Sequence, residues 1–148
     1  MACRITPYNN TAHRAQVISL WEAAFGYEAP HNAPDLVIDK KRAVDDGLFF
    51  VAVDQGEVIG TVMAGYDGHR GWIYSIAVAA AQRQRGLGSA LLVFAEKQLV
   101  ERGCLKINLQ IMEGNEAVEA FYRSNGYTTE RRISMGKALV DNIAIAIY

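Results

Sequence analysis

The segment 48–78 constrains the fold most strongly, because it contains three β-rich runs in close succession. A turn around Gly56 separates the first two runs, and a turn with the Asp67-Gly68 pair precedes the third. Connections this short join antiparallel neighbours, since parallel strands need a long crossover. We therefore predict an antiparallel meander whose strands cover residues 48–53, 58–66 and 72–78.

The chain before the meander indicates two helices. Residues 14–25 carry apolar side chains at helical spacing, and Gly26 is suited to end that helix. The two prolines of residues 27–34 favour a loop. We expect a second helix to follow as far as about Asp46. Its inward-facing residues are predicted to be Leu36, Val37 and Val44, and residues 3–7 are predicted to form a short first strand.

The chain after the meander alternates between the two patterns. Residues 87–102 have a helical apolar face, on which Leu87, Leu91, Phe94, Ala95 and Leu99 lie, and Gly103 is placed to end that helix. Residues 105–111 alternate apolar and polar side chains, as in a strand with one buried face. A short helix over 115–124, closed near Gly126, and further strands including 132–139 complete the prediction. The order is that of one mixed α+β domain over residues 1–148.

Composition excludes several classes of function. The formal net charge is −1, which leaves no electrostatic footprint for nucleic acid, and no long basic segment favours a membrane surface. The amino terminus has no apolar core of signal-peptide length, so with two cysteines we expect a reduced, cytoplasmic protein. The histidines and cysteines lack metal-ligand spacing, and we predict no metal site.

The junction between the third meander strand and the next helix can hold an anion. Gly86 and Gly88 allow close approach of a ligand to the backbone, and a helix start presents unpaired N–H groups. Arg83 and Arg85 add positive charge. By itself the segment is more often an ordinary helix start with solvated arginines. It is neither a phosphate-binding loop ending in Gly-Lys-Ser/Thr nor a dinucleotide fingerprint, because the required lysine and third glycine are missing.

Two spaced motifs together resemble the GNAT superfamily of N-acetyltransferases. Ile76-Ala77-Val78 followed by Arg83-x-x-Gly86-x-Gly88 is similar to that family's acyl-CoA signature. Asn115-x-Ala117, Phe121-Tyr122 and Gly126-Tyr127 resemble its second motif, in the family's order and separation. The resemblance covers the whole chain and implies an acyl-CoA N-acyltransferase fold, with a mostly antiparallel sheet that holds a splayed strand pair. Residues 32–34 and 65–71 resemble the small bacterial YpeA-type branch.

The resemblance implies that acetyl-CoA is the co-substrate and donates its acetyl group to a primary amine. Backbone groups of Ile76, Ala77 and Val78 are expected to pair with the pantetheine arm, and one N–H to polarise the thioester carbonyl. The strand with Ile107 is expected to splay from residues 72–78 and open the cleft for the cofactor. Asn115 is expected either to contact the cofactor, to cap its helix, or to do both. The pyrophosphate is expected on the segment Arg83, Gln84, Arg85, Gly86, Leu87, Gly88 and Ser89.

Tyr122 is the residue that the resemblance implies as proton donor to the leaving thiolate. A general base is harder to assign, because the strand 72–78 has no carboxylate, and Gln110 stands where related enzymes have a glutamate. His69, Asp67, Glu113 and water remain candidates. Ala79-Ala80-Ala81 also departs from the family pattern, which usually has a proline and an aromatic residue there. Cys104 is predicted to be a buried structural thiol.

The acceptor cleft is expected at the end of the first helix and the loop after it. Tyr27 and His31 are predicted to line it, whereas Trp21 and Phe25 are predicted to pack in the core. The apolar residues 142–148 favour an edge strand or a contact in a homodimer. The missing strand carboxylate leaves open a non-catalytic acyl-CoA-binding sensor or interaction module. An acyltransferase for a different acyl-CoA is a further alternative. The acceptor is predicted to be a small molecule or a peptide amine.

Overall fold

A single sheet organises the molecule in the computed structural model, which describes residues 3–26 and 32–139. Its strand order follows the chain, and β1 to β4 pair antiparallel, so the predicted meander is confirmed. The fifth strand pairs parallel to β4. The strands are β1 (Arg4–Pro7), β2 (Phe49–Asp54), β3 (Glu57–Tyr66), β4 (Gly71–Val78) and β5 (Ile107–Asn108).

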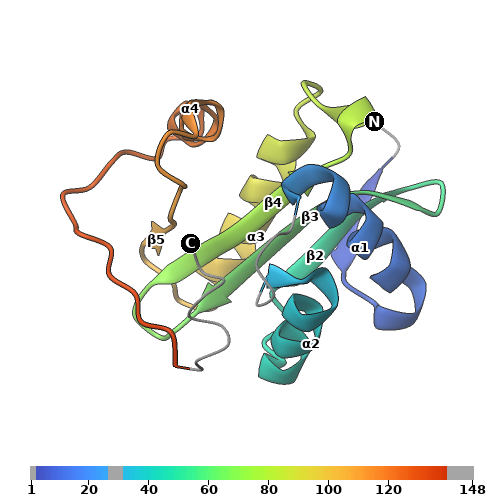
Figure 1. Cartoon of the computed structure of the whole chain (residues 1–148), viewed down its shortest axis with the longest axis horizontal. Helices are drawn as coiled ribbons and strands as arrows, with labels where there is room; N and C mark the ends of the chain where they lie inside the picture. Colours follow the sequence, from blue (N-terminus) through green and yellow to red (C-terminus); the bar gives the residue numbers. More distant parts are fainter. Residues whose placement is uncertain (1–2, 27–31, 140–148) are drawn as a thin grey trace.

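Helices cover both faces of the sheet (Figure 1). The helices α1 (Asn10–Phe25) and α2 (Pro34–Val44) pack on one face, and α3 (Leu87–Glu101) packs on the other. A short 3₁₀ turn, η2 (Ala80–Gln82), connects β4 to α3. The last helix, α4 (Glu116–Ser124), stands at the β5 side of the sheet. This mixed arrangement is the predicted α+β fold.

Two apolar clusters, one on each face, hold the layers together. Alternation along β2 sends Phe49, Val51 and Val53 toward α1 and α2, and sends Phe50 and Ala52 toward α3. Both faces are therefore covered, and β2 is buried along almost its whole length. The predicted α3 face is confirmed for Leu87, Leu91, Ala95 and Leu99, while Phe94 is partly buried at its margin.

The first two helices differ in detail from their predictions. Helix α1 begins one turn early, because the Asn9 side chain accepts a hydrogen bond from the Ala12 amide at 2.9 Å and caps it. Helix α2 ends at Val44, and the prediction that Leu36 and Val44 face inward is wrong, since both are exposed. The buried face of α2 instead carries Pro34 and Ile38.

Of the strands predicted after α3, one is shorter than predicted and the other is absent from the described residues. Within residues 105–111 only Ile107–Asn108 pair in the sheet, and Leu105 is 97% exposed. No strand forms in the described part of the chain after α4, so the predicted strand over 132–139 is wrong. The chain after α4 contacts the β5 region through side chains, as where Asn108 donates to Glu130 at 2.9 Å. The predicted edge at 142–148 lies outside the described residues.

Among the helices that the structure describes, none is both long enough and apolar enough to cross a membrane. Within the same ranges, no group of three or more histidine, cysteine or acidic side chains is arranged to hold a metal ion.

Candidate functional site

Strand β4 has one paired edge and one largely open edge. It pairs with β3 from Gly71 to Val78 but with β5 only at Gly71 and Trp72. Beyond Trp72 the chain of β5 continues toward α4 instead of following β4 (Figure 1). Within residues 3–26 and 32–139, the rest of this β4 edge has no strand partner.

The ladder with β3 determines which backbone groups this open edge presents. The Ala79 amide donates to the Ile59 carbonyl at 2.9 Å. Because backbone groups alternate in an antiparallel ladder, those of Ala77 also face β3, and those of Ile76 and Val78 face away from it. The side chain of Ala77 is buried toward α1, whereas Ile76 and Val78 pack on the α3 side. The open edge can therefore pair with an extended ligand through Ile76 and Val78.

A β-bulge interrupts β4 just before this stretch. Met63 lies opposite Ser75 and Ala64 opposite Ile73, so Tyr74 is the extra residue. The Tyr74 side chain is 60% exposed and packs over Gly65. Partial burial and nearby carboxylates raise the pKa of its hydroxyl. This bulge was not predicted, since the strand pattern of residues 72–78 continues through it without a break.

The start of α3 lies at the end of the open edge. Gly86 is the N-cap residue with φ 82°, and no side chain caps the helix. The Ala90 amide makes the first intrahelical bond, to the Gly86 carbonyl at 3.0 Å. In the described structure, the amides of Leu87, Gly88 and Ser89 thus have no hydrogen-bond acceptor. Unpaired amides and the positive end of the helix dipole together form an anion site.

The loop before α3 is held close to β4. Arg83 Nε donates to the Val78 carbonyl at 3.2 Å, and Gln84 has the left-handed φ of 63°. Arg83, Gln84 and Arg85 are all exposed. The two guanidinium groups therefore stand in solvent beside the uncapped amides, where they raise the local positive potential.

Helix α4 contacts the α3 start at Gly88. A Cβ added at Gly88 would lie 3.2 Å from Cε1 of Phe121 and 3.4 Å from its Cζ. The absence of a side chain at Gly88 thus lets α4 approach closely. The same helix carries Tyr122 and is capped by Asn115, whose Oδ1 accepts the Val118 amide at 3.3 Å. The capping role of Asn115 is confirmed, and its contact with a cofactor stays a prediction.

The Tyr122 ring is buried, with 8% of the residue exposed. Among the described residues, none forms a hydrogen bond with its hydroxyl. Burial raises the pKa of Tyr122 to about 12. The hydroxyl is therefore protonated at neutral pH, and no described residue engages its proton. It has a proton available for a leaving group within hydrogen-bond reach.

A second tyrosine packs against the first and binds α3. The rings of Tyr122 and Tyr127 are 5.5 Å apart, with 71° between their planes. The Tyr127 hydroxyl donates to Glu96 Oε2 at 2.8 Å, and burial together with this carboxylate raises its pKa well above 10. Glu96 was not predicted as a site residue, because in the sequence it is one more polar position on a helix.

The candidates for a general base are less suitable. Asp67 Oδ1 accepts the amides of His69 at 2.8 Å and Arg70 at 2.7 Å, and these bonds lower the pKa of its carboxyl group. Asp67 is thus a turn residue with reduced basicity. His69 and Glu113 are both exposed on turns. Gln110 donates to the Ser134 hydroxyl at 2.5 Å.

Three of the remaining predicted positions, Trp21, Phe25 and Cys104, are described by the structure, and two are not. Trp21 is buried as predicted, and its Nε1 donates to the buried Thr61 hydroxyl at 2.9 Å. Phe25 is partly exposed, so its assignment to the core is wrong. Cys104 is buried, as predicted. Tyr27 and His31 lie outside the described residues.

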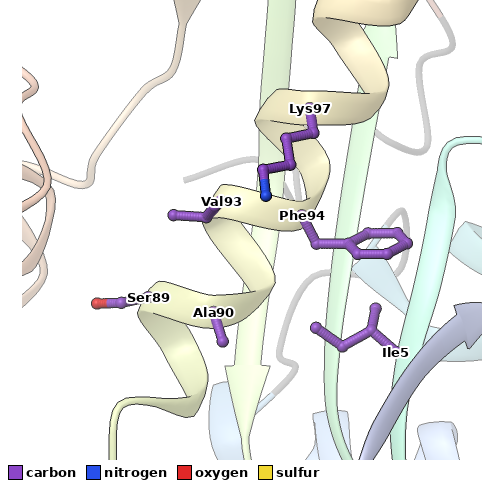
Figure 2. Close-up of a pocket in the computed structure, with 6 residues that line it drawn as sticks. All are labelled: Ile5, Ser89, Ala90, Val93, Phe94 and Lys97. Atoms are coloured by element: carbon purple, nitrogen blue, oxygen red, sulfur yellow. The ribbon is translucent and has the colours of Figure 1, made fainter.

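A groove of about 370 Å³ runs along α3 on the side of β1 (Figure 2). Ile5, Ala90, Val93 and Phe94 give it apolar walls, and Ser89 and Lys97 complete the lining. Because β1 and β5 are at opposite edges of the sheet, this groove is separate from the open β4 edge.

An open strand edge leads to an uncapped helix start, and a buried tyrosine stands on the helix that packs against that start. This arrangement is suited to an extended, phosphate-bearing ligand. The sequence model of the acetyltransferase (GNAT) family matches residues 14–127. An acetyltransferase of Pectobacterium atrosepticum, ECA0875, is 43% identical over 126 residues, which are 85% of this chain and 89% of that protein. The chain belongs to the GNAT family.

Solved structures agree on the fold. Ard1 from Thermoplasma volcanium superposes with a TM-score of 0.76 at 22% identity, covering 86% of this chain and 84% of that chain. The aminoglycoside N-acetyltransferase AAC(6')-Iy in complex with CoA gives a TM-score of 0.75 at 20% identity, covering 93% and 95%. Family membership makes the chain an N-acetyltransferase with acetyl-CoA as donor. Its assignment to the YpeA-type branch stays a prediction.

Proposed function

We propose that the protein transfers the acetyl group of acetyl-CoA to a primary amine by direct attack on the thioester. The observation that carries this proposal is the continuous arrangement of the open β4 edge, the uncapped α3 start and the uncommitted Tyr122 hydroxyl. The open edge would take the pantetheine arm, the α3 start would take the pyrophosphate at one end of that arm, and Tyr122 would meet the thioester sulfur at its other end.

The residues at hand fit that molecule. The backbone of Ile76 would pair with the pantetheine arm, with Ala77 as the spacer that β3 retains. Val78 would contribute its amide, since its carbonyl already accepts Arg83 Nε. The amides of residues 84–89 would bind the pyrophosphate, with Arg83 and Arg85 near its charge. Asn115 would use its amide NH₂ for the cofactor, since its Oδ1 is engaged in capping.

The chemistry then needs two proton movements. The amine nitrogen forms a bond to the acetyl carbon, the carbon–sulfur bond breaks, and Tyr122 gives its proton to the departing sulfur. The nitrogen loses a proton to water, and proton exchange with solvent restores the Tyr122 hydroxyl. Asp67 is a poor acceptor for this proton, because its Oδ1 accepts two backbone amides. An oxyanion donor from the open β4 edge would stabilise the tetrahedral intermediate.

The first test is calorimetric titration of the protein with acetyl-CoA. We expect saturable binding, and a protein that binds none at millimolar acetyl-CoA would defeat the proposal. The second measures CoA thiol release over a panel of small amines and peptide amino termini. Release that depends on one amine supports the enzyme, whereas binding without release from any amine supports the acyl-CoA sensor. A larger thermal shift with propionyl- or succinyl-CoA than with acetyl-CoA would favour a different acyl donor.

The role of Tyr122 is tested by Tyr122→Phe, which removes the hydroxyl and keeps the ring. We expect turnover to fall by roughly 10²-fold, in the range of general acid catalysis, with acetyl-CoA affinity retained. The matched control is Tyr8→Phe, because Tyr8 lies near β1 at the opposite side of the sheet and its hydroxyl donates to Asn10 at 2.8 Å. Equal turnover in both variants would remove Tyr122 from the acid role.

A further inference from the structure

Within residues 3–26 and 32–139, nothing forms a hydrogen bond with the hydroxyl of the proposed acid. The Tyr122 hydroxyl is unpartnered among the described residues, so packing of the ring alone sets its position. Phe121 contacts the ring edge-on with centroids 5.0 Å apart, and Tyr127 does so at 5.5 Å. Phe121 is a neighbour on the same helix and moves with Tyr122. Tyr122 also belongs to the apolar cluster on the α3 face, whose contacts carry no direction. Tyr127 is therefore the aromatic contact from outside α4 that can orient the ring of Tyr122.

Tyr127 is itself fixed at both ends. Its amide donates to the Tyr122 carbonyl at 3.0 Å, which closes the end of α4. Its hydroxyl donates to Glu96 Oε2 at 2.8 Å in a partly buried position. Glu96 lies in the third turn of α3, the helix whose first residues form the anion site. The bond thus connects the element that would hold the pyrophosphate with the one that would hold the acid.

Few other contacts restrain α4. Residues 112–120 are all exposed, and Tyr122 is the residue of α4 that is buried. The approach of Phe121 to Gly88 is apolar and allows the helix to slide or rotate. A directional hydrogen bond to a carboxylate restrains both distance and orientation.

We propose that Glu96 is a positioning residue, which through Tyr127 holds the ring of Tyr122 at the thioester sulfur. This inference rests on the proposed function of Tyr122 as the acid, and it adds a requirement on α3 that the family motifs do not contain. A displacement of about 1 Å at a reacting group lowers rates by up to about 10²-fold. Loss of the bond should therefore lower turnover and leave binding of the cofactor almost unchanged.

The experiment compares Glu96→Ala, Tyr127→Phe and their double variant with Glu96→Gln, whose amide oxygen still accepts the tyrosine hydroxyl. We expect kcat to fall about tenfold in each single variant. The kcat of the double variant should be no lower than that of either single variant, because the two substitutions remove the same hydrogen bond. We expect KM for acetyl-CoA to stay within about twofold, and Glu96→Gln to restore most of kcat. Glu101→Ala, an exposed glutamate of the same helix, is the control.

A readout independent of activity uses tyrosine labelled with ¹³C at Cζ, with the Tyr122 signal identified by its loss in Tyr122→Phe. The signal should shift or broaden in Glu96→Ala and return in Glu96→Gln. The proposal is overturned if Glu96→Ala and Tyr127→Phe keep wild-type kcat and an unchanged Tyr122 signal. It is also overturned if Glu96→Gln and Glu96→Ala lower kcat and thermal stability equally and both change KM, since the role is then structural. If Tyr122→Phe alone is fully active, the acid role fails, which is a separate result.

Discussion

At the scale of residues, Gly86 combines an uncommon backbone conformation with a proposed contact to phosphate. Its φ is 82°, and Gly56 in the β2–β3 turn has nearly the same φ of 80°. A Cβ meets nothing within 4 Å at either position, so the backbone alone is strained by a substitution. We predict that Gly86→Ala and Gly56→Ala each lower the free energy of unfolding in urea by about 1–2 kcal/mol, and that only Gly86→Ala weakens acetyl-CoA binding. Equal affinities would place the phosphate elsewhere.

The buried hydroxyl of Tyr122 makes a second residue-scale prediction, about alkaline pH. Its pKa is raised from 10 to about 12, because burial disfavours the tyrosinate. The folded protein therefore retains this proton between pH 10 and 12 while the unfolded chain loses it. Stability from this group is complete below pH 10 and is lost as the pH rises to 12. Urea unfolding should show a steeper decline over that window in the wild type than in Tyr122→Phe, and parallel declines would contradict the assignment.

At the scale of elements, one buried hydrogen bond attaches α1 to the sheet. Trp21 Nε1 donates to the hydroxyl of Thr61 in β3, and both residues are buried. We predict that Thr61→Val, which leaves the indole N–H unpaired, lowers the free energy of unfolding by about 1–3 kcal/mol. Thr11→Val, at an exposed position of α1, should change it by less than about 0.5 kcal/mol. Both values come from urea denaturation, and equal effects would mean that the bond contributes nothing.

Predictions from the sequence were correct where the pattern lies within a short segment of the chain, and they failed where the structure depends on contacts with distant segments. The meander was predictable because turn residues and alternation occur within each hairpin. The inward face of α2 was not, because Lys41 takes an inward position: its side chain is 9% exposed and pairs with Asp46 at 2.8 Å. The helical pattern cannot reveal a buried lysine whose partner follows the helix. Likewise, the alternation in 105–111 cannot show whether a neighbouring strand is available to pair with it.

The residues of the candidate site also fall into those that the sequence predicted and those that it did not. Gly86, Gly88 and Tyr122 were found because they belong to contiguous motifs. The bulge at Tyr74 and the bond between Tyr127 and Glu96 were not, because they depend on register and on contacts between distant segments. The role of Asp67 was predicted in part. The Asp-Gly pair predicts a turn, but it does not predict that the Asp67 carboxylate accepts the amides of His69 and Arg70.

At the scale of the molecule, the two halves differ in how much they bury. Strands β1 to β4 with α1 and α3 contain most of the buried apolar side chains, whereas β5 has two paired residues and α4 one buried residue. Segments with few buried contacts open at a lower free energy than the core. In amide hydrogen exchange, we therefore predict that α4 exchanges faster than β3 in the free protein.

Acetyl-CoA should change this difference, because the proposed site joins β4 and the α3 start to α4. At a concentration of 100 times Kd, a ligand adds about 2.7 kcal/mol to any opening that breaks its site, which slows exchange of α4 amides by about 100-fold. Peptides from α2 that exchange by local opening should be unaffected, since none of its residues is assigned to the site. Mass spectrometry of exchange with and without acetyl-CoA measures both. Protection of the α3 start without protection of α4 would mean that the cofactor contacts only one side of the cleft, and that Tyr122 does not reach its sulfur.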